Sequence, residues 1–113
     1  MSKLRDKQVQ FAKDLALLIQ KAFELGYEVT LGEVKRDQRI ADLNAAAGKG
    51  ISKSLHLVSL AVDLNLFAND IYLSSTEHHL PLGEWWEKLG PEHFWGGRFN
   101  DGNHYSIGYE GRK

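Results

Sequence analysis

The beginning of the chain carries apolar residues at helical spacing. Between Ser2 and Gly26 they recur every three or four positions, at Phe11, Leu15, Leu18, Ala22 and Leu25. Side chains at this spacing share one face of an α-helix. Ser2 suits the N-cap, because its hydroxyl can accept a hydrogen bond from the first turn, and Gly26 suits the end of the helix, because glycine readily adopts a left-handed conformation. The pattern predicts an amphipathic helix between these two residues.

A later segment alternates between apolar and polar positions. Every second residue of the segment 60–67 is apolar, namely Leu60, Val62, Leu64 and Leu66. Because successive side chains of a strand point to opposite faces, Asp63 and Asn65 lie on the other face. The segment therefore predicts a strand with one face toward the core and one face free to carry chemistry. Weaker signals predict further strands over residues 27–34 and 104–109.

Helical spacing returns in two shorter segments. The first ends in a loop at residues 48–50 and has apolar side chains at Ile40, Leu43 and Ala47. The second begins at Pro81, which suits the first turn of a helix, and ends at Gly90. Asparagine and aspartate at residues 69–70 predict a turn, and residues 95–103 predict a loop.

Together these elements predict an α+β fold in which N-terminal helices pack on a small, mainly antiparallel sheet. The chain has 113 residues, so we expect a single domain over residues 1–113. Its composition, 42% hydrophobic and 26% charged, is ordinary for a globular protein and predicts that the chain folds.

Charge and composition exclude several kinds of site. The net charge of −1 provides no broad basic surface, so we expect no nucleic-acid partner. Cysteine is absent, so any metal must be held by histidines and carboxylates. No apolar run reaches the roughly 18 residues of a membrane span. The charged residues 1–7 lack the apolar stretch of a secretory signal, so we do not expect export by a signal peptide.

Three side chains could form a catalytic metal site. His56 precedes the alternating strand, Asp63 lies on its polar face, and His104 begins the predicted last strand. A catalytic zinc site takes three such ligands and leaves a fourth position for water. Asp101 lies three residues before His104 and could act as a general base. Spacing alone leaves open the alternative that all four are ordinary polar residues of strands and loops.

Two separated motifs carry a family resemblance. Residues 54–63, SLHLVSLAVD, resemble the Ser-x-His and Ala-x-Asp signature of the zinc D-alanyl-D-alanine carboxypeptidase and L-alanyl-D-glutamate endopeptidase family. Residues 95–106, WGGRFNDGNHYS, are similar to the closing motif of its phage endolysin branch. The resemblance implies a hedgehog and DD-peptidase-like fold in which His56, Asp63 and His104 bind Zn²⁺.

The resemblance also implies roles for residues around the metal. Asp101 matches the catalytic base, Arg36 matches an arginine that helps hold the substrate during catalysis, and Ser54 matches a serine that contacts the substrate. An Asp-x-x-His ending, in place of Glu-x-x-His, favours the endolysin branch. The sequence departs from the family where Val58 and Ser59 stand in a stretch that often contains glycine, and at the residues flanking Arg36.

The implied substrate is the stem peptide of peptidoglycan. Cleavage of its L-alanyl-D-glutamate bond is the preferred reaction, and D-alanyl-D-alanine cleavage is the alternative within the family. A noncatalytic zinc-binding or peptide-binding module remains an alternative of another class. The resemblance further implies a phage enzyme that is made in the host cytoplasm and acts at the cell wall after release. We expect the protein to be a monomer.

Other histidines and aromatic residues have simpler interpretations. His78 and His79 could bind a metal ion, but they follow a polar segment that predicts an exposed loop. His93 either supports the metal site from outside or is a structural, partly buried histidine. The three tryptophans are Trp85, Trp86 and Trp95. They could line a substrate groove, but we expect them to pack in the core.

Overall fold

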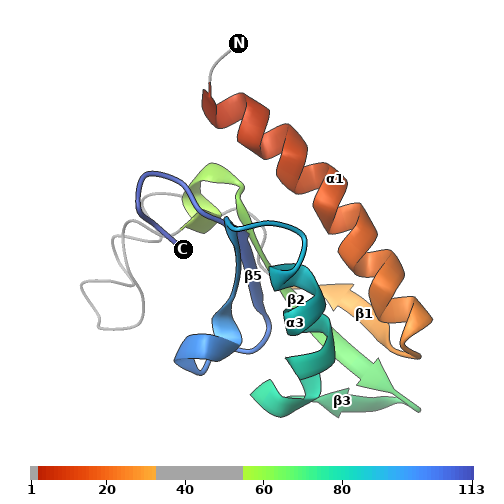
Figure 1. Cartoon of the computed structure of the whole chain (residues 1–113). Coiled ribbons are helices and arrows are strands. Elements are labelled where there is room, and N and C mark those ends of the chain that lie inside the picture. The colour runs from red at the N-terminus through yellow and green to blue at the C-terminus, as the bar shows by residue number, and fades with distance from the viewer. Residues whose placement is uncertain (1–2, 33–54) are drawn as a thin grey trace.

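The computed structural model of the protein describes residues 3–32 and 55–113 (Figure 1). Its helices are α1 (Lys3–Glu24) and α3 (Leu80–Glu87), and its short 3₁₀ segments are η1 (Leu55–Val58), η2 (Thr76–His79) and η3 (Gly96–Phe99). Its strands are β1 (Glu28–Leu31), β2 (Ala61–Ala68), β3 (Ile71–Leu73), β4 (His93–Trp95) and β5 (His104–Ile107). The helix predicted from Ile40 to Ala47 and the loop after it lie outside the described residues.

The strands form one antiparallel sheet in the order β1-β2-β5-β4, and β3 also pairs with β2. The long strand β2 is central: β1 pairs along one edge, and β5 and β3 pair along the other. Helices and a small antiparallel sheet confirm the predicted α+β fold. Within the described residues, no helix is long and apolar enough to cross a membrane.

Both helices cover the same face of the sheet. Trp86 of α3 lies at the centre of this core, with its ring edge-on to those of Phe11 from α1 and Tyr105 from β5. The register pairs Tyr105 with Val62, so both side chains are on the helix-covered face. Asp63 must then face the opposite side. The predicted division of this strand into a core face and a polar face is confirmed.

The end of α1 follows the predicted glycine stop. Gly26 has a φ of 92°, which side chains with a Cβ rarely adopt. The amide of Tyr27 donates to the carbonyl of Ala22, and that of Gly26 donates to the carbonyl of Phe23, both at 3.0 Å. This is the Schellman pattern, in which the last carbonyls of a helix find partners after the chain has turned. The turn directs the chain from α1 into β1.

Two short strands, β3 and β4, were not predicted from the sequence. Both β3 and β4 have three residues, too few for a period of two to stand out from irregular chain. The predicted turn at Asn69 and Asp70 is present, and positive φ angles of 52° and 64° suit a two-residue hairpin between β2 and β3. Part of the predicted loop 95–103 is η3, and Trp95 is the last residue of β4.

Candidate metal centre

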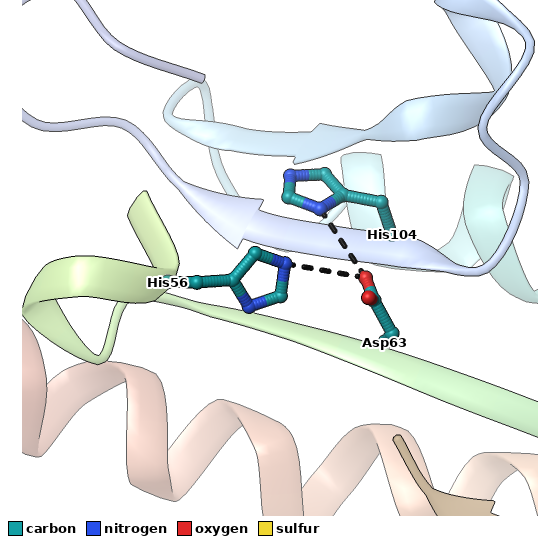
Figure 2. A group of neighbouring side chains, drawn as sticks. All are labelled: His56, Asp63 and His104. Carbon is teal, nitrogen blue, oxygen red and sulfur yellow. Dashed lines mark ion pairs between the residues drawn. The ribbon is translucent and has the colours of Figure 1, made fainter. Parts of the chain in front are cut away.

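The three predicted metal ligands lie together on the face of the sheet opposite the helices (Figure 2). One ligand atom from each of His56, Asp63 and His104 lies within 4.8 Å of the other two. Asp63 and His104 are direct partners in the β2–β5 register, so their side chains emerge side by side. Strand pairing thus joins two residues that are far apart in the sequence.

A tight turn between η1 and β2 brings His56 to the other two residues. The Leu60 amide donates to the Leu55 carbonyl at 3.1 Å, and both leucine side chains are buried. Ser59 adopts a left-handed conformation with a φ of 56°. This is a backbone conformation that favours glycine. Because both leucines are anchored in the core, the imidazole of His56 is directed over the polar face of β2.

The spacing of the three side chains leaves room between them. His56 Nε2 lies 3.3 Å and His104 Nδ1 lies 3.5 Å from the same oxygen, Asp63 Oδ1. Figure 2 shows both imidazoles turned toward this carboxylate. Both distances exceed those of charge-assisted hydrogen bonds, which are about 2.7–2.9 Å. Two nearly buried imidazoles and a half-buried carboxylate at this spacing could hold a metal ion.

The electrostatics of Asp63 suit a cation. Burial acts to raise the pKa of this carboxyl, but the adjacent imidazoles of His104 and His56, together with their charges, lower it to about 2. The carboxylate is therefore ionised at neutral pH. An ionised oxygen ligand is what a divalent ion requires.

Asp101 lies beside this group on the loop between η3 and β5. Its amide donates to the Gly96 carbonyl at 2.8 Å, and its own carbonyl accepts from the His104 amide at 3.1 Å. Burial raises the pKa of the Asp101 carboxyl, and the charges of His104, Asp63 and His56 all act on it. It is not one of the clustered ligands. This placement agrees with the role of a base, which stays a prediction.

Gly96 allows the Asp101 loop to close. A Cβ at this position would lie 2.2 Å from the Asp101 carbonyl oxygen and 2.7 Å from the Cβ of His104. A residue with a side chain would not fit so close to the loop, so this position requires glycine. The other two predicted site residues, Arg36 and Ser54, lie outside the described residues, and their substrate roles stay predictions.

The remaining histidines differ in their burial and in their contacts. His78 is exposed, but His79 is buried and its Nδ1 lies 2.8 Å from the Tyr105 hydroxyl, so the predicted exposed loop is wrong for His79. His93 pairs with Ile107 in the sheet, on the helix-covered face, and its Nε2 lies 2.6 Å from Asp14 Oδ2 in α1. His93 is thus structural and lies on the opposite face of the sheet from the metal ligands.

The tryptophans confirm the core interpretation. Trp86 and Trp95 are buried, and Trp85 is partly buried against the same core. The indole nitrogens of the two buried tryptophans both have hydrogen-bond partners. The indole N–H of Trp86 donates to the Ser106 carbonyl, and that of Trp95 donates to the Gly102 carbonyl.

The buried His79 predicts a loss of stability in acid. Burial, with the nearby charge of His78, lowers the pKa of His79 from 6.5 to about 4. Since the unfolded chain binds this proton more readily, the stability contributed by neutral His79 is complete above pH 6.5 and is lost as the pH falls through 4. At about 1.4 kcal/mol for each pH unit between those values, the loss reaches at most about 3–4 kcal/mol.

Urea unfolding between pH 7 and pH 4, in the presence of a chelator, measures this effect. We expect the free energy of unfolding of H79Q to fall less steeply with acid than that of the wild type. The exposed neighbour provides the matched control, because H78Q should keep most of the wild-type slope. Equal slopes for H79Q and the wild type would contradict the assignment.

Comparison with known proteins identifies the fold. No family model matches the sequence, and no curated protein matches it. Among solved structures, the chain is similar to the L-Ala D-Glu endopeptidase ChiX of Serratia marcescens, with a TM-score of 0.68 and 20% sequence identity. The match covers 85% of this chain and 79% of that chain. The protein therefore shares its α+β fold with this endopeptidase.

Proposed function

We propose that the protein is a zinc-dependent peptidase that hydrolyses the L-alanyl-D-glutamate bond of the peptidoglycan stem peptide. One observation carries the proposal: two imidazoles and a carboxylate cluster on the face of the sheet opposite the helices, with Asp101 beside them. The shared fold with an L-Ala D-Glu endopeptidase supports the substrate class. The motifs around His56 and His104 support it independently of the fold.

The donor set fits zinc. Zinc in proteins prefers tetrahedral sites with Zn–N and Zn–O distances of about 2.0–2.2 Å, which places neighbouring ligand atoms about 3.3–3.5 Å apart. The distances of 3.3 Å and 3.5 Å from Asp63 Oδ1 to the two imidazole nitrogens lie in this range. Two histidines and one carboxylate are also a ligand set found in zinc peptidases. We infer that His56, Asp63 and His104 hold the ion.

The residues around the ion have distinct tasks in hydrolysis. Bound zinc supplies Lewis acidity, which lowers the pKa of water from about 15.7 to about 7 and polarises a carbonyl. Asp101 accepts the proton of the attacking water and delivers it to the leaving amine. Arg36 is proposed to hold the substrate.

Digestion of purified murein with the zinc-loaded protein tests the function. Cleavage of the proposed bond creates new D-glutamate amino termini, which end-group labelling and mass spectrometry detect. Release of free D-alanine without these termini would replace the proposed bond with D-alanyl-D-alanine. Binding of zinc without either product would reduce the protein to a noncatalytic module.

A further inference from the structure

The short helix η2 connects two parts of the candidate metal centre. At its start, the Thr76 hydroxyl oxygen accepts a hydrogen bond from the Gly102 amide at 3.2 Å. At its end, the buried His79 is hydrogen bonded to the hydroxyl of Tyr105, the residue that follows His104 in β5. One turn of helix therefore contacts both the loop that carries Asp101 and the strand that carries His104.

Contacts with other elements hold the peptide groups after Asp101. Gly102 is buried, its amide donates to Thr76, and its carbonyl accepts from the Trp95 indole at 2.7 Å. The Asn103 carbonyl accepts from the Leu64 amide of β2 at 2.9 Å. Because glycine has the widest backbone freedom, these contacts, and not the conformational preference of Gly102, must set the path of the chain.

Thr76 and Gly102 are also packed tightly. A Cβ at position 102 would lie 2.5 Å from the Thr76 Cα and 2.9 Å from its hydroxyl oxygen. The loop thus rests directly on Thr76, without space for an intervening side chain. Thr76 lies in neither of the two sequence motifs, and spacing along the chain could not connect it with residue 102.

We propose that Thr76 is a positioning residue that fixes the carboxylate of Asp101 for proton transfer. The inference rests on the proposed function. Loss of the hydroxyl acceptor leaves the Gly102 amide without its partner. Of the two hydrogen bonds described for the peptide between Asp101 and Gly102, only that from the His104 amide to the Asp101 carbonyl then remains, so the peptide is less firmly fixed. General base catalysis depends on the distance between the carboxylate and the water proton, and a displacement of about 1 Å can cost about 100-fold in rate.

Two substitutions separate the hydroxyl from the shape of the side chain. T76V keeps the shape but removes the acceptor, whereas T76S keeps the acceptor. On zinc-loaded protein with a soluble stem peptide, we expect T76V to lower kcat by about 10- to 100-fold, with KM within about twofold of the wild type. T76S should retain kcat within about threefold. Both variants should bind one zinc ion, as the wild type is expected to do.

The wild type, D101N and T30V are assayed together with these variants. Hydrolysis by the wild type and its loss in D101N establish the proposed function separately from the role of Thr76. T30V is the matched control, since it removes a threonine hydroxyl that contacts Asn65 on β2 and should keep wild-type kcat.

Three results would overturn the inference: wild-type kcat in T76V, equal losses in T76V and T76S, or a loss of activity that follows a loss of zinc. An inactive wild type would overturn the inference together with the proposed function. If T76V does not fold, T76A takes its place with the same expectations.

Discussion

Replacing Asp101 with asparagine is expected to lower kcat for stem-peptide hydrolysis by about 10²- to 10⁴-fold while zinc stays bound. The amide has nearly the shape of the carboxylate but cannot accept the proton of the attacking water. Since Asp101 is not one of the clustered metal ligands, the substitution should leave the zinc stoichiometry unchanged. Steady-state kinetics and metal analysis on the same preparation measure both quantities.

A second aspartate provides the control for this experiment. Asp70 lies in the exposed hairpin turn between β2 and β3, where its φ of 64° is one that asparagine tolerates well. D70N makes the same chemical change and should leave kcat at the wild-type value. Activity in D101N close to that of the wild type would show that another group accepts the proton.

Removal of one metal ligand is expected to abolish both zinc binding and hydrolysis. In H104A only His56 and Asp63 remain of the clustered group. Because loss of a residue that merely supports a ligand already costs about 10- to 100-fold in metal affinity, loss of the ligand itself should cost more. Zinc should raise the melting temperature of the wild type, because it binds the folded state, and should leave that of H104A unchanged.

Calorimetric titration with zinc, together with thermal unfolding with and without the metal, tests this expectation. H78A is the control, because it removes an exposed histidine whose ring contacts Ser75 and not the metal ligands. Chelation should abolish hydrolysis by the wild type, and added zinc should restore it. Zinc-dependent stabilisation of H104A equal to that of the wild type would remove His104 from the ligand set.

Local sequence determined the longer elements. Apolar residues at helical spacing and a glycine stop defined α1, because a helix of this length presents several turns of its buried face. Alternation over β2 determined that Asp63 points away from the core. The family motifs selected His56, Asp63 and His104 as a group, although spacing alone left them as possible surface residues.

Tertiary structure decided what depends on contacts between distant segments. The strands β3 and β4 exist because β2 and β5 pair with them, and three residues carry too weak a pattern to show this. Burial distinguished His79 from its neighbour His78, because one turn of η2 directs only His79 toward Tyr105. The same applies to the contact between Thr76 and Gly102, which no motif indicated.

The sequence by itself determined which residues have the chemistry for a metal centre and which face of its strand Asp63 would use. Only the fold decided that they meet, because the β2–β5 register places Asp63 opposite His104 and the turn at Ser59 brings His56 to them. Such proximity results from hydrogen bonds and core packing across the sheet. Local periodicity contains no information about either.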